Sequence, residues 1–409
     1  MSVRLKVENS DNAFARNWRG IASAFLKLGL TAYGGLAIMG IMQTELQEKR
    51  QWISKDRFVE GLALVNTLPG PGAIQLGIYL GYARGGSWGG LLAGLCFVLP
   101  AFFIMLALTV GYAAYGATPL LSSALYGLGP VVIGVFLVAV YRLAKSVVTT
   151  VTQLAIAVAA AVVLVQNALG AVELMGVAGA IGLWMFHSRR LGAIVLGVVI
   201  ASIVMAHLAS AAWMPAVSGA GASTHSVSLF NIGSFFFIVG AFSFGGGLSM
   251  IALIQEQVVQ NYHWLTQREF IDGLALGQVT PGPILMVAAY VGYKLAGLAG
   301  AVVAAMAIFV PSFILMLSIL PALERVRKLI WAKAALRGIG PAVIGIITVS
   351  LFRMAPYALP DPIAIALLVC TVVALLAWRI GAIKLVLLGA LAGVLRSRLP
   401  LIPAIRTML

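Results

Sequence analysis

Long apolar stretches, separated by short polar loops, recur along the whole chain. Five of them are Trp88–Tyr115, Val147–Val165, Leu191–Trp213, Leu295–Leu320 and Pro362–Trp378. Each comes close to the roughly 20 residues that a helix needs to cross a bilayer. Backbone amides in hydrocarbon must be paired within their own segment, and the alternating pattern of barrel strands is absent, so helices are predicted. The pattern is typical of an all-α polytopic membrane protein.

Composition strengthens this prediction. Hydrophobic residues make up 61% of the 409 residues and charged residues only 10%, whereas a soluble domain carries about 25% charged residues. The net charge of +15 does not indicate nucleic-acid binding, because Lys and Arg lie between the apolar stretches. The positive-inside rule places them there in proteins of the cytoplasmic (inner) membrane. The lipid bilayer is therefore the predicted partner.

The chain offers few groups for catalysis or metal binding. Cys96 and Cys370 stand alone in apolar runs, and the four His are scattered without metal-ligand spacing, so no metal or other cofactor is expected. No Lys follows a Gly, which excludes a P-loop. A membrane-embedded enzyme would need paired catalytic side chains on helices, and that pattern is missing. The sequence predicts that the protein is not an enzyme.

The sequence contains two copies of one unit. Pro69-Gly70-Pro71 corresponds to Pro281-Gly282-Pro283 at an offset of 212, and after a one-residue gap Arg142 corresponds to Arg353 at an offset of 211. Chance does not keep register over such a distance, so an internal repeat is predicted. The predicted division is an N-terminal cytoplasmic segment (1–19), a first repeat (20–187), a linking helix and loop (188–229), a second repeat (230–398) and a C-terminal tail (399–409).

The two repeats are predicted to have inverted topology. The stretch Leu191–Trp213 has no counterpart in the other repeat. If each repeat crosses the membrane an even number of times, this one extra crossing turns the second repeat upside down. The loop Gln43–Arg57 holds four Lys or Arg, whereas its counterpart Gln255–Glu269 holds only Arg268, so equivalent loops face opposite sides. Arg396 and its neighbours oppose this reading, because they place a basic C-terminus outside. The number of membrane segments stays open between about ten and thirteen.

Each repeat is interrupted by a Pro-Gly-Pro turn and by a glycine run. Proline cannot continue a helix, and it also forces the preceding residue out of the helical region. The helix that restarts after such a break presents unpaired N–H groups, which favour an anion. Gly-Pro breaks elsewhere, at Pro100, Pro130, Pro311 and Pro341, can also be simple packing kinks.

The breaks and the polar residues around them form the predicted binding or translocation path. Its residues are Gly34, Gly35, Asn66, Thr67, Pro69, Gly70, Pro71, Gln75, Tyr82, Gly246, Gly247, Gln278, Thr280, Pro281, Gly282, Pro283 and Tyr293. Glu60 and Asp272 are matched carboxylates upstream of the turns, and either a coupling or a structural role is open for them. Inverted repeats with broken helices are typical of secondary transporters, which hold the substrate near the midplane.

These motifs resemble the chromate ion transporter family in its long, two-domain form. The resemblance rests on Phe244-Gly245-Gly246-Gly247, on Gly61-Leu62-Ala63-Leu64 before the first Pro-Gly-Pro turn, on Gly81-Tyr82, and on their counterparts in the other repeat. It covers nearly the whole chain. The first glycine motif departs from the pattern, because Tyr33 stands where the second repeat has Gly245. The resemblance implies export of chromate across the cytoplasmic membrane, which confers chromate resistance.

Export of a tetrahedral dianion is physically reasonable for such a protein. Moving one charge through 100 mV is worth about 2.3 kcal/mol, so a dianion leaving a negative interior gains roughly 4.6 kcal/mol. Sulfate shares the charge and geometry of chromate, and a sulfate or other oxyanion transporter or antiporter is the main alternative. A passive anion channel is a further alternative, and a homodimer is left open.

Overall fold

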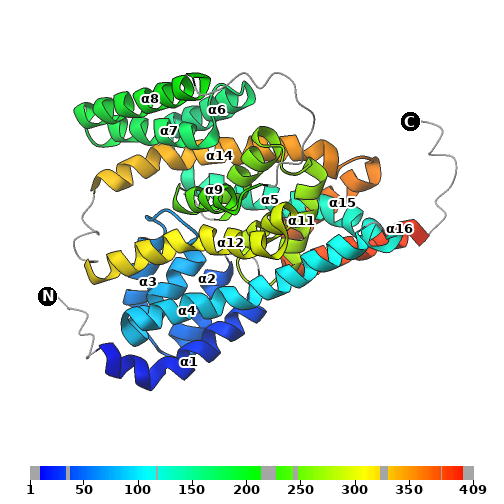
Figure 1. The fold of residues 1–409 in the computed structure, drawn as a ribbon, viewed down its shortest axis with the longest axis horizontal. Coiled ribbons are helices and arrows are strands. Elements are labelled where there is room, and N and C mark those ends of the chain that lie inside the picture. Colours follow the sequence, from blue (N-terminus) through cyan, green and yellow to red (C-terminus); the bar gives the residue numbers. More distant parts are fainter. Residues whose placement is uncertain are drawn as a thin grey trace.

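The computed structural model describes residues 10–33, 37–116, 118–212, 227–242, 247–322, 330–378 and 380–398, and these residues form helices and no strands (Figure 1). The first repeat holds α1 (Ser10–Thr31), α2 (Ala37–Met42), the π-helix η1 (Gln43–Lys49), α3 (Lys55–Val65), α4 (Gly72–Tyr115), α5 (Pro119–Val147), α6 (Val151–Val165) and α7 (Ala171–Phe186). The linking helix is α8 (Arg189–Ala212).

The second repeat follows the same order. It holds α9 (Leu229–Phe242), α10 (Gly247–Gln255), the π-helix η2 (Glu256–Asn261), α11 (Gln267–Val279), η3 (Ile284–Met286), α12 (Val287–Ile319), η4 (Leu320–Ala322), α14 (Ile330–Ala358), α15 (Pro362–Leu376) and α16 (Ala382–Arg398). The all-α fold predicted from the sequence is confirmed for the described residues.

Both α4 and α12 contain a sharp reversal. In α4 the backbone leaves the helical region at Gly85 and Gly86, and Gly86 has φ +63°. Gly81 then packs directly against the carbonyl of Gly89, so the segments before and after the reversal run antiparallel. A side chain at Gly81 would not fit, since the two backbones meet there. The same reversal occurs at Ala296 and Gly297 of α12.

The Pro-Gly-Pro turns close two short helical hairpins. The Tyr79 hydroxyl donates to the carbonyl of Arg57 at 2.9 Å, which holds the start of α4 antiparallel to α3. In the second repeat the Tyr290 hydroxyl donates to the carbonyl of Glu269 at 2.9 Å. A helix of 11 residues such as α3 is about 16 Å long, which is roughly half of the 30 Å hydrocarbon layer. Of the two possibilities open from sequence, this geometry fits re-entry rather than crossing.

Helix α1 packs against α4 and η1. Helix α1 runs beside the second part of α4, with Gly29 against the carbonyl of Phe97, at 2.6 Å from an added Cβ. The π-helix η1 lies beside α1, because the Lys27 ammonium lies 3.5 Å from Oε1 of Glu45 on η1. Helix α1 ends beside the second Pro-Gly-Pro turn, because the N–H of Gly282 donates to the carbonyl of Ala32 at 2.7 Å.

The two repeats interlock crosswise through their later helices. Helix α5 packs on α15 and α16, and α14 packs on α6 and α7 (Figure 1). Arg142 of α5 donates to the carbonyl of Leu375 at 3.1 Å, and its counterpart Arg353 of α14 donates to the carbonyl of Leu164 at 3.0 Å. Such reciprocal contacts between equivalent residues are the mark of a two-fold relation.

Helices α4 and α12, which are equivalent, run antiparallel where they meet. A Cβ at Gly90 would lie 3.2 Å from Leu317, and a Cβ at Gly94 would lie 2.5 Å from Phe313. As the residue number rises along α4, the contact moves back along α12. This pairing brings the middle of each helix to the other repeat's turn.

Four described segments are long and apolar enough to cross a membrane. They are Pro119–Val147 and Lys333–Ala358, together with Gly72–Tyr115 and Ile284–Ile319, each of which includes one of the reversals described above. Shorter apolar helices of the described chain are Val151–Val165, Ala171–Phe186, Leu229–Ala241 and Pro362–Leu376. The stretch Val147–Val165 is not one helix as predicted, because Thr150 and Gln153 form a capping box that starts α6 anew.

Candidate functional site

The first Pro-Gly-Pro turn separates two helices by a tight backbone reversal. Asn66 ends α3, Gly70 has φ +114°, and α4 begins at Gly72. This φ favours glycine, since an L side chain is strained there. The N–H groups of Ile74 and Gln75 donate to the carbonyl of Pro71. The N–H groups before them face the turn as the free amino end of the helix.

Two side chains from different repeats converge on Gly70. A Cβ at Gly70 would lie 2.6 Å from Nε2 of Gln75 and 2.6 Å from Oγ of Ser312 on α12. Gln75 is fully buried and Ser312 is 1% exposed. Nε2 of Gln75 donates to the carbonyl of Pro69, which ties the turn to α4. Oε1 of Gln75 and Oγ of Ser312 are buried without a hydrogen-bond partner among the described residues.

Unpaired buried polar atoms are rare in folded proteins, and each costs about 1–3 kcal/mol. Two of them beside one strained turn therefore mark a polar site inside an otherwise apolar protein. Sequence reasoning found Gln75 but missed Ser312. The available signal was the comparison of the repeats, since Ser312 follows Pro311 where Ala101 follows Pro100.

The second Pro-Gly-Pro turn has the same backbone but other neighbours. Gly282 has φ +91°, and its N–H donates to the carbonyl of Ala32 at the end of α1, at 2.7 Å. A Cβ at Gly282 would lie 2.8 Å from Cβ of Ala101. Thr280 is buried, and its hydroxyl donates to the carbonyl of Leu276 at 2.9 Å. The positions that correspond to Gln75 are the apolar Met286 and Val287.

The other predicted path residues lie at different distances from the turns. Thr67 is half-buried with its hydroxyl bonded to the carbonyl of Ala63 at 2.7 Å, and Asn66 is exposed. Gln278 is half-buried next to the second turn. Gly247 begins α10, where a Cβ would lie 3.4 Å from Ile284.

Some predicted path residues are not brought to the turns. Tyr82 lies about 16 Å along the helix from Pro71, and Tyr293 has the equivalent position in the second repeat. Both tyrosines therefore lie at the end of a hairpin opposite its Pro-Gly-Pro turn. Gly34, Gly35 and Gly246 lie outside the described residues. The described part of the predicted path is thus concentrated at the two turns.

Asp272 of α11 takes part in a cluster of polar side chains. The Tyr112 hydroxyl donates to its Oδ2 at 3.0 Å, and Nε of Arg268 lies 3.5 Å from Oδ1, within ion-pair range but outside hydrogen-bonding geometry. Glu269 forms an ion pair with Lys294 at 2.8 Å. The Tyr112 bond joins α4 of the first repeat to α11 of the second. Its matched carboxylate, Glu60, is half-buried on α3.

These features define a helical membrane protein built from two repeats, each with a helical hairpin closed by a Pro-Gly-Pro turn. The chain belongs to the chromate transporter family, whose model matches residues 20–183 and 230–394. The family resemblance seen in the motifs is therefore confirmed.

Curated relatives cover almost the whole chain. The chromate transport protein of Cupriavidus metallidurans is 34% identical over 363 residues, covering 88% of this chain and 87% of that one. The probable chromate transport protein of Synechococcus elongatus is 32% identical and covers 93% and 96%. The chromate transport protein of Pseudomonas aeruginosa is 30% identical and covers 90% of each chain. No solved structure matches significantly.

Proposed function

We propose that the protein is a secondary transporter that exports chromate across the cytoplasmic membrane and so confers chromate resistance. Family membership and relatives named as chromate transport proteins support the substrate. The observation that carries the site is the pair of buried, unpartnered polar atoms, Oε1 of Gln75 and Oγ of Ser312, at the first Pro-Gly-Pro turn.

The first turn supplies the groups that a tetrahedral oxyanion requires. The Ser312 hydroxyl can donate to an unprotonated oxygen, and the free N–H groups at the start of α4 add a positive dipole end. Oε1 of Gln75 only accepts, so it suits the O–H of a singly protonated oxyanion or of a water molecule. Neutral donors of this kind hold a dianion without the strong attraction of a fixed positive charge, which would slow release.

Inverted topology is part of this proposal. Helices α4 and α12 are equivalent and run antiparallel where they touch, at Gly90 with Leu317 and at Gly94 with Phe313. Helix α8 has no counterpart in the repeats, which supports its proposed role as the unmatched crossing, and equivalent loops have opposite charge bias. Inversion brings the two turns toward one central path, with the repeats at 20–187 and 230–398 and the linking segment at 188–229. Alternating access then follows from movement of one repeat against the other.

An accumulation assay in cells tests the proposal. Cells that express the full chain should accumulate less chromate than matched cells without it. In everted membrane vesicles, excess sulfate should lower chromate uptake if sulfate shares the site. Equal chromate accumulation in both strains would contradict export. Sulfate transport with no effect of chromate would assign the site to sulfate, the alternative of identical charge and shape.

A homologous pair of substitutions ties the assay to the site. Ser312→Ala should weaken chromate transport, whereas Ala101→Ser, at the equivalent position of the other repeat, should not. Both variants change one hydroxyl at a buried position next to a Pro-Gly-Pro turn. Equal loss in the two variants would mean that packing, rather than the polar site, controls transport.

A further inference from the structure

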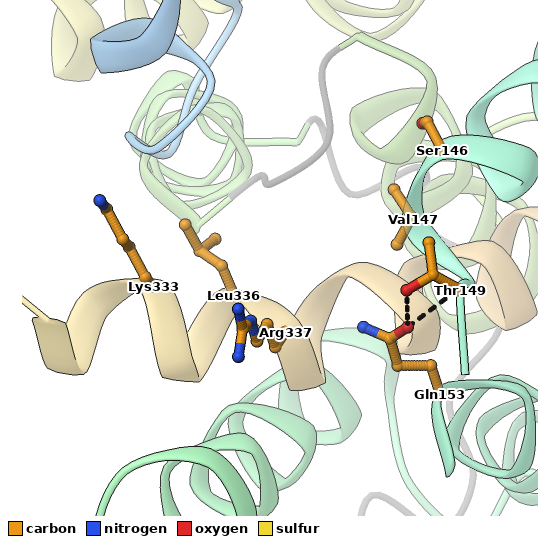
Figure 2. Close-up of a pocket in the computed structure, with 7 residues that line it drawn as sticks. All are labelled: Ser146, Val147, Thr149, Gln153, Lys333, Leu336 and Arg337. Atoms are coloured by element: carbon orange, nitrogen blue, oxygen red, sulfur yellow. Dashed lines mark hydrogen bonds between the residues drawn. The ribbon is translucent and has the colours of Figure 1, made fainter. Parts of the chain in front are cut away.

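A separate cavity of about 310 Å³, open to the surface, lies between the turn joining α5 to α6 and the beginning of α14 (Figure 2). Its described lining consists of Ser146, Val147, Thr149, Gln153, Lys333, Leu336 and Arg337. Helix α14 begins at Ile330 and is long and apolar enough to cross a membrane, so Lys333 and Arg337 place the cavity near the N-terminal end of a candidate span rather than beside the turns.

Gln153 offers an oriented donor to this cavity. It is 7% exposed, and its Oε1 accepts from the N–H of Thr149 at 2.8 Å, the Thr149 hydroxyl at 3.0 Å and the N–H of Thr150 at 3.2 Å. These three bonds fix which end of the amide is oxygen, so the NH₂ group faces the opposite way. Figure 2 shows the Gln153 nitrogen on the side toward Arg337. No described group accepts from this nitrogen.

Two cations complete the cavity. Lys333 and Arg337 lie one turn apart on α14, both exposed, and the seven lining residues include no Asp or Glu. The Arg337 guanidinium lies 5.7 Å from the centre of the Phe186 ring, and it forms no ion pair with a carboxylate of the described residues. The described lining thus combines an amide donor and two cations with no acidic residue, and Val147 and Leu336 add apolar surface.

The equivalent place in the other repeat is neutralised. Ser122, Tyr126 and Ala364 stand where Lys333, Arg337 and Gln153 stand here. The nearby Asp361 accepts from Tyr126 and forms an ion pair with Arg396 at 2.8 Å. The unpaired basic cavity is therefore a property of this chain's own residues and not a consequence of the repeated fold.

We propose that this cavity binds a phosphate group, with Gln153 Nε2, Arg337 and Lys333 as its donors. A phosphate oxygen accepts strongly from guanidinium and amide N–H groups. Two sources share this chemistry: the headgroup of an anionic phospholipid at the boundary, and free inorganic phosphate. Basic pockets between membrane helices are suited to anionic headgroups, and the apolar lining gives room for the start of an acyl chain.

Native mass spectrometry of the full chain from nanodiscs tests the proposal. Wild-type protein should retain phosphatidylglycerol in preference to phosphatidylcholine. Lys333→Gln and Arg337→Gln should each lower phosphatidylglycerol retention roughly fivefold, and the double variant more. Both side chains are exposed, so the fold should tolerate these changes. Lys55→Gln, which removes an exposed charge at the start of α3, is the matched control and should change nothing.

Gln153→Glu separates binding from folding. A carboxylate can still accept the three bonds that cap α6, but it loses the NH₂ donor and brings a negative charge to the cavity. This variant should keep the thermal unfolding midpoint of the wild type and lose phosphatidylglycerol retention.

A second arm distinguishes the source of the phosphate. In nanodiscs of phosphatidylcholine alone, millimolar inorganic phosphate should leave the unfolding midpoint unchanged if the ligand is a lipid. A rise that the double variant abolishes would assign the cavity to free phosphate. The proposal is overturned if the cavity variants keep wild-type phosphatidylglycerol retention and phosphate also has no effect.

Discussion

The two Pro-Gly-Pro turns have the same backbone and opposite surroundings. Gly70 and Gly282 both have positive φ, and each packs against the middle of the other repeat's long helix. At Gly70 the neighbours are Gln75 and Ser312, each with an unsatisfied polar atom. At Gly282 the neighbour is Ala101, and the N–H is already bonded to the carbonyl of Ala32.

This difference separates what the repeat determines from what individual residues determine. The duplicated sequence gives both turns their shape and position, because proline and glycine rules act locally. Side chains outside the motif decide which turn has polar atoms left for a ligand. The first turn is therefore the candidate binding site. The second turn has its backbone N–H hydrogen-bonded and an apolar neighbour, so its role is structural.

The largest effect is expected from Gly70→Ala compared with Gly282→Ala. Both substitutions place a Cβ at positive φ, which costs about 1–2 kcal/mol. At Gly70 the new Cβ would lie 2.6 Å from both Gln75 Nε2 and Ser312 Oγ and displace the polar pair. We expect Gly70→Ala to abolish chromate transport in proteoliposomes, while Gly282→Ala keeps measurable transport.

Thermal unfolding of the same two variants provides the control for stability. Similar midpoints with unequal transport would assign the difference to the site. If the two variants lost transport equally, the distinction between the turns would be wrong.

The next effect concerns the hydroxyl that differs between the repeats. Removing one hydrogen bond to a charged ligand costs about 1.5–3 kcal/mol, so Ser312→Ala should raise the chromate Kd roughly tenfold or more. Without ligand the same variant should be no less stable, since it removes an unpaired buried hydroxyl. Equilibrium binding of chromate to purified protein measures the first quantity and thermal unfolding the second. An unchanged Kd would remove Ser312 from the site.

A smaller effect is expected from the two matched carboxylates. Asp272→Asn removes the ion pair with Arg268 and gives the Tyr112 hydroxyl a neutral acceptor in place of a charged one, so we expect a loss of about 1–2 kcal/mol in stability. Glu60→Gln, at a half-buried position, should cost less. Chromate flux measured against pH distinguishes the two possible roles. A pH dependence that disappears in only one variant would identify that carboxylate as the coupling group, and unchanged profiles in both would leave them structural.

Sequence rules identified the breaks because their causes are local. Proline ends a helix wherever it stands, so the turn at Pro69-Gly70-Pro71 was readable without any tertiary information. The reversal at Gly85 and Gly86 was not, because it lies inside a continuous apolar run. Re-entry therefore could not be separated from crossing. Ser312 was missed because its contact with Gly70 joins two repeats, and only folding places them together.

The same limit applies to the crosswise packing of the repeats. Matched residues such as Arg142 and Arg353 revealed the duplication, but each one's partner lies in the other repeat. Pairing within each repeat would have been the simpler expectation. The boundary at Thr150 shows the opposite case, in which a local capping signal was present and was overlooked in favour of hydropathy.

The smallest effect on stability is expected from Arg142 and Arg353, the equivalent arginines that each bond to a helix of the other repeat. At these two positions the repeats are most alike. Arg142→Lys and Arg353→Lys each retain the charge but lose the guanidinium bond to a helix-terminal carbonyl. A typical hydrogen bond contributes about 0.5–1.5 kcal/mol, so the two variants should lower the unfolding free energy by similar amounts. Arg353 also donates to Oδ1 of Asn167 at 2.9 Å, which makes its loss slightly larger. Chromate affinity should be unchanged in both. A large loss in only one variant would show that the two-fold relation does not extend to the energetics of the interlocked helices.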